Sequence, residues 1–329
     1  MENAFKLFYM KQIKNSLQIS YKSVLFALCV SGCVFLSACS SSDKEAALTE
    51  VEVSNASTHT FQTNVLVPES SGENIIGSNE VSIDISNVSE GYIVVTYTGE
   101  CAKVKLQLSV DGDATYTYNL TPSLETVIPL SSGDGTYLVT VYENIGNDQY
   151  ASNFSDCFDV TISNTFGPFL YPNQYVNFNK DTKAVKIASE LTTSATTELE
   201  AVACVYSYVA SNIVYDKEEA ETVESSYLPD VDEVLETGKG ICFDYASLMA
   251  AMLRSIGIPT RLEIGYAKDA YHAWISVYTQ DQGWIGGVIQ FDGSDWSLMD
   301  PTLAANAKDS KKIKQFIGDG TSYTVKYIY

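Results

Sequence analysis

Alternation of apolar and polar residues predicts strands through the first half of the chain. Val81–Ile85 and Val104–Val110 place an apolar side chain at every second position, which is the period of a strand with one buried face. Asp111-Gly112 and Gly133-Asp134-Gly135 mark turns, because glycine reaches the positive φ that tight turns need. No helical period interrupts this pattern. It therefore predicts an antiparallel β-sandwich over residues 63–165.

The pattern changes near Phe166. Thr197-Glu-Leu-Glu200 has the spacing of a helix capping box, and apolar residues follow at helical intervals. A second helix is predicted to start at Cys242 and to end where Gly257 and Pro259 prevent its continuation. Apolar and aromatic runs then predict three strands, at 271–278, 284–291 and 296–300. Helices and strands are therefore expected to mix in the second half.

The N-terminus is typical of a secretory signal. Lysines precede an apolar run from Val24 to Ala38, whose length as a helix, about 22 Å, is short of the bilayer core of about 30 Å. Leu36-Ser37-Ala38-Cys39 resembles a bacterial lipobox, which implies cleavage before Cys39 and its acylation. We expect residues 1–38 to be a lipoprotein signal peptide and residues 39–62 a lipid anchor and linker. An ordinary signal peptide with a chance cysteine is the alternative.

Charge and composition limit the partners. Forty-one acidic residues against 20 Lys and Arg give a net charge of −21, so binding to nucleic acid is not expected. The two histidines and the absence of CxxC or HxxxH spacing give no reason to expect a metal or another cofactor. We expect an extracytoplasmic protein that contacts the bilayer through acylated Cys39. Its substrate would be a peptide or protein at the cell surface, with cell-wall peptides as one class.

A disulfide is one open question. Cys101 and Cys157 both fall in the predicted sandwich, and disulfides persist outside the cytoplasm. A bridge between them would stabilise the fold by about 4 kcal/mol in the loop-entropy model. The sequence does not give the separation of their Cα atoms, so the bridged and the free states both remain possible.

The candidate chemistry lies between Gly238 and Thr302. Cys242 falls at the start of a predicted helix, where unpaired backbone N–H groups and the helix dipole favour a thiolate. His272 is near the start of a predicted strand and is available as a base. Asp300, at the end of the last predicted strand, could accept the ring N–H of His272. Asp292 and Asp295 are nearby alternatives.

The residues around this set carry a family resemblance. They are Gly238-Lys-Gly-Ile-Cys242-Phe-Asp-Tyr-Ala, Gly257-Ile-Pro-Thr, Tyr271-His-Ala-Trp and Trp296-Ser-Leu-Met-Asp300-Pro-Thr. Over about residues 184–307 the chain resembles the bacterial transglutaminase-like family. The resemblance implies a papain-like α+β core, with Cys242 as nucleophile, His272 as general acid and base, and Asp300 as orienting residue. We therefore expect an α+β transglutaminase-like domain at 166–329, preceded by the all-β sandwich.

The resemblance is incomplete. No tryptophan precedes Cys242, so the side chain that stabilises the oxyanion in animal transglutaminases has no counterpart, and their calcium regions are unmatched. Trp284 is a candidate for a substrate groove. Tyr245, one helical turn beyond Cys242, could line the cleft or simply pack within the protein. Arg254 and Arg261 are expected to pair with surface acids.

Two functions follow from these residues. In the first, Cys242 attacks a peptide or glutamine amide carbonyl and forms a thioester, while His272 protonates the departing amine. Hydrolysis of the thioester is favoured over cross-linking, because water is the default nucleophile. In the second, the chain is a non-catalytic binding or scaffold lipoprotein at the cell surface.

Overall fold

The computed structural model describes residues 61–329 except 111, 268–269, 292–295 and 298–322. The described residues belong to one compact unit, Thr58–Tyr329. Cys39, Asp292, Asp295 and Asp300 lie outside them, so the predictions made for these residues remain predictions. Within the described part, no helix is long and apolar enough to cross a membrane.

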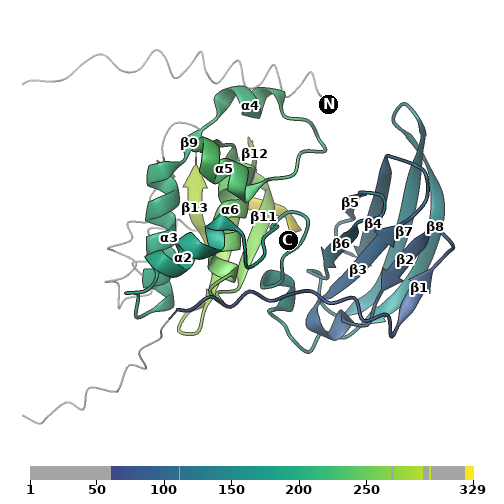
Figure 1. Ribbon diagram of the computed structural model, residues 1–329, viewed down its shortest axis with the longest axis horizontal. Helices are drawn as coiled ribbons and strands as arrows, with labels where there is room; N and C mark the ends of the chain where they lie inside the picture. Colours follow the sequence, from purple (N-terminus) through teal and green to yellow (C-terminus); the bar gives the residue numbers. More distant parts are fainter. Residues whose placement is uncertain (1–60, 111, 268–269, 292–295, 298–322) are drawn as a thin grey trace, which may run out of the picture. The chain divides into compact units, whose positions relative to one another are not determined.

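The N-terminal region contains two four-stranded antiparallel sheets (Figure 1). The first has the order β1 (Ile75–Gly77), β2 (Val81–Asp84), β3 (Tyr92–Tyr97), β6 (Glu125–Pro129), and a 3-10 helix, η1 (Val88–Glu90), precedes β3. The second has the order β5 (Tyr116–Leu120), β4 (Val104–Val110), β7 (Gly135–Gly146), β8 (Gln149–Val160). Buried side chains from both sheets form a common core, as in a β-sandwich. The predicted all-β region is confirmed.

Turn residues separate the strands as the sequence predicts. Gly112 lies between β4 and β5, which pair antiparallel, and its φ is 84°. Gly133, between β6 and β7, has a φ of 81°. Residues with a Cβ rarely adopt such positive φ values, so glycine is required in both turns. The alternating pattern of β4 is also observed, because Val104, Leu106 and Leu108 are buried.

The structure contradicts a disulfide between Cys101 and Cys157, because both thiols are free. Cys157 pairs with Leu138 on β7, whereas the Cys101 sulfur lies 3.7 Å from the carbonyl oxygen of Asn144. Leu138 and Asn144 are six residues apart along β7, or about 20 Å at about 3.3 Å per residue. A disulfide needs Cα atoms within about 7 Å.

The C-terminal region combines helices with a five-stranded antiparallel sheet. The sheet has the order β14 (Trp296–Ser297), β13 (Gly283–Phe291), β12 (Ala270–Thr279), β11 (Thr260–Ala267), β15 (Tyr323–Ile328). The helices are η2 (Gly167–Phe169), α2 (Lys183–Leu191), α3 (Glu198–Asn212), α4 (Lys217–Thr222), α5 (Val231–Thr237) and α6 (Cys242–Arg254). A short parallel pair, β9 (Val214–Tyr215) and β10 (Lys239–Gly240), precedes α6. The mixed α/β architecture predicted for this half is confirmed.

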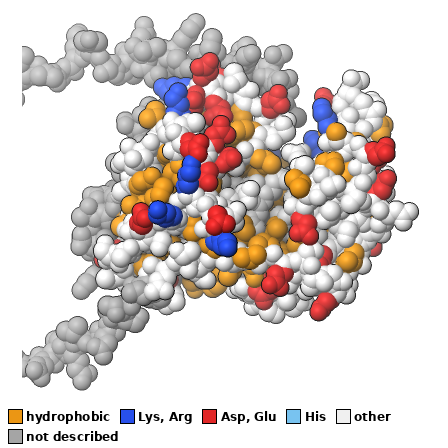
Figure 2. Space-filling model, viewed as in Figure 1, with side chains coloured by type: hydrophobic (Ala, Val, Ile, Leu, Met, Phe, Trp, Pro, Cys, Tyr) orange, Lys and Arg blue, Asp and Glu red, His pale blue; other side chains and the backbone are white. Residues whose placement is uncertain are grey.

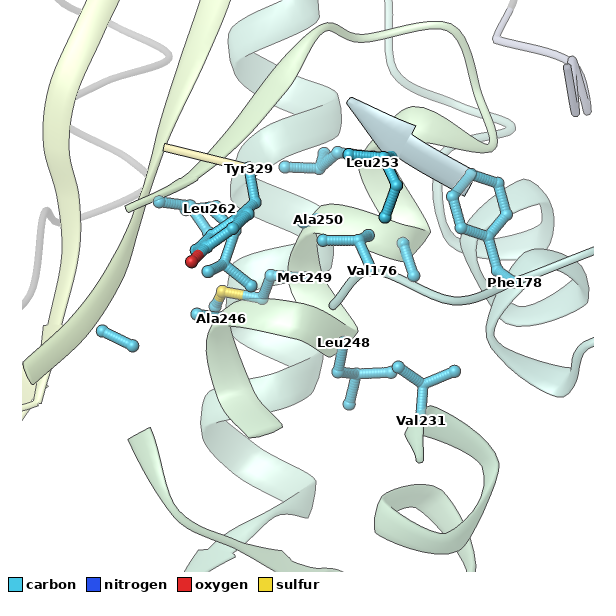
Figure 3. Packing of buried hydrophobic residues seen from close by; sticks show 14 of the residues in the cluster. Val176, Phe178, Val231, Ala246, Leu248, Met249, Ala250, Leu253, Leu262 and Tyr329 are labelled. Atoms are coloured by element: carbon cyan, nitrogen blue, oxygen red, sulfur yellow. The ribbon is translucent and has the colours of Figure 1, made fainter. Parts of the chain in front are cut away.

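Helix α6 forms the centre of this region. It packs against β11 and β12 on one side and against α2, α3 and α5 on others (Figure 1). Every residue from Asp244 to Arg254 is buried. Figure 3 shows labelled side chains of α6 together with those of four other segments: Ala246, Leu248, Met249, Ala250 and Leu253 with Val176, Phe178, Val231, Leu262 and Tyr329. This packing holds the start of α6 in a fixed place.

Arg254, at the end of α6, corrects the prediction of a surface ion pair. Its side chain is fully buried, and it donates hydrogen bonds to three backbone carbonyls. These belong to Thr260 at 2.9 Å, Tyr171 at 2.9 Å and Tyr329 at 2.8 Å. The planar guanidinium carries donors in several directions, so one side chain can satisfy three peptide groups of different segments.

Acidic side chains gather over α4 and α5, as Figure 2 shows. The exposed members are Glu218, Glu221, Glu224, Asp230, Glu233 and Glu236. Part of this acidic surface is α4, whose first turn is capped by the Asp216 carboxylate, which accepts from the backbone N–H groups of Glu218 and Glu219.

Candidate active site

Cys242 is the first residue of α6, as the sequence predicts. The helix starts there because the carboxylate of Asp244 accepts a hydrogen bond from the backbone N–H of Ile241 at 2.7 Å. Gly240 lets the chain approach this carboxylate, since a Cβ at Gly240 would lie 2.7 Å from the Cβ of Asp244. The loop before α6 is thereby fixed, and with it the peptide that carries the thiol.

The Cys242 thiol is surrounded by backbone donors from two elements. The N–H groups of Cys242 and Phe243 come from the start of α6, and the N–H of Ala273 comes from β12. These three groups favour a thiolate. Burial has the opposite effect and is the larger one, so the pKa of Cys242 is raised to about 11. The helix start thus favours the thiolate, as the sequence predicts, but packing that excludes the water needed to solvate the charge has the larger effect.

His272 lies on β12 next to Ala273, the residue whose N–H contacts the Cys242 sulfur. It is half-buried and is paired with Gly265 of β11. Its ring is near that of Trp274, with 6.4 Å between the centroids and 21° between the planes. The structure thus brings Cys242 to the part of β12 that carries His272, although the two residues are distant in sequence.

A buried polar cluster, which the sequence analysis missed, holds Trp274 in place. Glu263 of β11 is 6% exposed, and its carboxylate accepts from the Trp274 indole at 2.6 Å and from the Ser276 hydroxyl at 2.8 Å. Burial raises the pKa of Glu263. This cluster fixes the indole that lies beside His272. The sequence did contain one indication of this cluster, because Trp274 and Ser276 are at alternate positions of a predicted strand and so are expected on the same face of the sheet.

The two groove candidates occupy different environments. Tyr245 is 3% exposed, and its hydroxyl donates to the Ile213 carbonyl at 2.7 Å, which favours packing within the protein over a cleft role. Trp284 is partly exposed and lies 3.8 Å from the Arg261 guanidinium, measured to the ring centroid. Arg261 also lies over the ring of Phe169 at 4.8 Å. Stacking on aromatic faces, instead of a surface ion pair, therefore accounts for Arg261.

Asp244 also connects α6 to the acidic segment. Its second carboxylate oxygen accepts from the Tyr227 hydroxyl at 2.7 Å. Asp244 is fully buried, and this burial, helped by the charges of Glu219 and Glu233, raises its pKa to about 6. The carboxyl therefore takes up its proton closer to neutral pH than an exposed Asp does.

The raised pKa of Asp244 predicts a pH effect on stability. Its folded pKa of about 6 exceeds the value of 3.8 for an unperturbed Asp, so this group stabilises the fold below about pH 4 and loses that contribution as the pH rises through about 6. Between about pH 4 and about pH 7.5, the free energy of unfolding of the wild type should fall by about 3 kcal/mol more than that of Asp244→Asn. The asparagine keeps a donor and an acceptor but does not titrate. Urea denaturation at several pH values measures this. The exposed Asp181→Asn variant should follow the wild-type curve, and a similar course for Asp244→Asn would contradict the assignment.

No cluster of three or more His, Cys, Asp or Glu side chains suited to a metal ion occurs in the described part of the chain. The geometry therefore gives a partly buried thiol at a helix start, backbone donors around it, and a histidine on the adjoining strand segment. A cysteine nucleophile requires such a base beside it.

Part of the chain matches a known protein family. Residues 185–286 match the model of the Transglutaminase-like superfamily. The chain is also 30% identical over 118 residues to YebA of Bacillus subtilis, described as an uncharacterized protein. That match covers 30% of this chain and 16% of YebA, so the chain spans a small part of this relative's length.

Solved structures give weaker likenesses. A proposed cysteine protease from Cytophaga hutchinsonii is 16% identical with a TM-score of 0.34, over 64% of this chain and 67% of that one. Red sea bream transglutaminase is 14% identical with a TM-score of 0.27, over 64% and 49%. The family match places a transglutaminase-like domain at 185–286, which follows a β-rich N-terminal region in the sequence.

Proposed function

We propose that the chain is an extracytoplasmic cysteine enzyme that cleaves peptide or glutamine amide bonds through a thioester on Cys242. The observation that carries this proposal is the contact between the Cys242 sulfur and the N–H of Ala273, which follows His272 on β12. In this proposal acylated Cys39 holds the protein at a bacterial membrane. Asp300, outside the described residues, is the proposed orienting partner of His272.

The raised pKa of Cys242 determines how the reaction would start. Because the isolated thiol is neutral at pH 7, His272 must take its proton as the sulfur attacks the amide carbonyl. The C–N bond then breaks, and the imidazolium returns the proton to the departing amine. Water, activated by His272, attacks the thioester and releases the acid and the thiol. We favour water over an amine as second nucleophile, so cross-linking is the lesser activity, and cell-wall peptides are one class of substrate.

The pH dependence of thiol alkylation tests this assignment. Iodoacetamide is reacted with the full chain from about pH 5 to about pH 10, and mass spectrometry follows the peptide that contains Cys242. We expect labelling of Cys242 below pH 7 in wild type, because proton transfer to His272 gives a thiolate–imidazolium pair in place of the lone thiolate whose burial raises the pKa. That labelling should be lost in His272→Ala. The variant thiol should then react only at high pH, as its buried environment dictates.

Cys157 is an internal control in the same samples, because it is a free and exposed thiol. Its labelling at each pH should be the same in wild type and in His272→Ala. If Cys242 reacts only at high pH in both proteins, the enzyme proposal fails, and a binding or scaffold protein becomes the better account.

A further inference from the structure

One end of the C-terminal sheet exposes aromatic side chains on neighbouring strands. Tyr266 of β11 is 38% exposed and Tyr271 of β12 is 47% exposed. The two residues are paired across the strands, and their rings meet edge to face with 5.5 Å between the centroids. Lys326 of β15 places its ammonium 5.7 Å from the Tyr266 ring centroid and 6.0 Å from that of Tyr327. We call these four residues, Tyr266, Tyr271, Lys326 and Tyr327, the tyrosine shelf.

The tyrosine shelf is next to the candidate nucleophile. Tyr271 and Ala273 are alternate residues of β12 and so share one face of the sheet. Ala273 is the residue whose N–H reaches the Cys242 sulfur. Burial raises the pKa of the Tyr271 hydroxyl, and charge on Cys242 adds to this effect, which agrees with the short separation of Tyr271 and Ala273 along β12. A substrate bound at the thiol would therefore extend over the shelf.

Lys326 gives the shelf a positive charge in a protein whose net charge is −21. None of the ion pairs within the described residues includes Lys326. Its ammonium lies over tyrosine rings, where it remains available to an anion.

We propose that the tyrosine shelf is a substrate subsite that selects an apolar or aromatic side chain followed by a carboxylate, close to the amide attacked by Cys242. Ring surfaces at Tyr266 and Tyr271 bind the side chain, and Lys326 binds the carboxylate by charge complementarity. This inference rests on the proposed function and adds a substrate class to it: peptides with an acidic group or a free C-terminus next to the cleaved bond.

Alkylating probes test the shelf without requiring turnover. N-chloroacetyl-phenylalanine carries a ring and a carboxylate, its amide carries the ring alone, and N-chloroacetyl-glycine carries the carboxylate alone. The rate of modification of Cys242 by each probe is measured by mass spectrometry. In wild type the acid should react roughly three- to five-fold faster than the amide, the size expected for an exposed ion pair. It should also react roughly three- to ten-fold faster than the glycine probe, through ring contacts.

The ratio of the acid to the amide rate is the quantity compared among variants. In Lys326→Gln it should fall to about one or below, because the overall acidic surface then repels the acid. Lys186→Gln, on the exposed face of α2, should keep the wild-type ratio. A wild-type ratio near one, or equal ratios in Lys326→Gln and Lys186→Gln, would overturn the proposal.

These ratios do not depend on how reactive the thiol itself is, since both probes carry the same chloroacetyl group. A failure of the shelf is therefore distinguishable from a failure of the enzyme proposal. The first appears as a lost ratio with His272-dependent labelling intact. The second appears in the iodoacetamide profile, whatever the ratio.

Discussion

Replacing Arg254 by methionine is expected to lower the free energy of unfolding by about 3 kcal/mol. The change leaves the carbonyls of Thr260, Tyr171 and Tyr329 without the donor that each has in the native fold. A buried peptide group without its partner costs about 1–3 kcal/mol. Part of this loss is offset, because methionine removes a charge whose burial is unfavourable. That burial lowers the pKa of Arg254 to about 9. The hydrogen bonds outweigh the charge, since three partners are lost together.

Urea denaturation with an unchanged slope measures this effect. Arg254→Lys provides a second variant, because lysine keeps the charge but cannot reach three carbonyls through one planar group. We expect it to be about as destabilising as methionine, whereas the exposed Lys186→Met should change stability by less than about 0.5 kcal/mol. An Arg254→Met protein as stable as wild type would show that the three contacts contribute nothing.

Gly265→Ala is expected to have an effect of similar size, at about 3 kcal/mol, through steric overlap. A Cβ at Gly265 would lie 2.0 Å from the carbonyl oxygen of Thr324 and 3.0 Å from the backbone nitrogen of Lys326. Both atoms are backbone, so β15 must move away from β11 and cannot relieve the overlap by rotating a side chain. The irregularity in the register of this strand pair falls at the same place, between Ile264 and Gly265.

Gly286→Ala is the matched control for that variant. Gly286 belongs to β13 of the same sheet, and a Cβ there would lie 3.6 Å from the Ser276 hydroxyl, an ordinary contact. Alanine should be tolerated with a change below about 0.5 kcal/mol. Urea denaturation of both variants, with amide hydrogen exchange at Val325, gives the comparison. Equal stability of Gly265→Ala and Gly286→Ala would contradict the assigned overlap.

Local patterns predicted much of this architecture. The alternation in 104–110 gave β4, and the capping box at Thr197 gave the start of α3, where the Thr197 hydroxyl accepts from the backbone N–H of Glu200 at 3.2 Å. Both signals act between near neighbours. The pairing of β15 with β11 was not predicted, because it joins segments that are distant in sequence and leaves no local trace.

The candidate site shows the same division. Motifs predicted Cys242 at the start of a helix and His272 near the start of a strand. The structure has Cys242 as the first residue of α6 and His272 as the third residue of β12. They could not show that burial outweighs the helix dipole at the thiol, since burial depends on what packs around α6. Charge misled the analysis of Arg254, because a lone arginine is usually exposed, and only the fold reveals three carbonyls converging on one side chain.

The contact between Arg254 and Tyr329 joins residues 75 positions apart in the sequence. During synthesis, α6 is therefore complete long before Tyr329, whose carbonyl accepts one of the hydrogen bonds of Arg254. A nascent chain that stops before residue 323 leaves β11 with an unpaired edge and Arg254 short of one partner. Open strand edges recruit other chains, so such truncated products are expected to aggregate. Residues 323–329 thus complete the scaffold that carries the cysteine only after α6 and β11 have been synthesised.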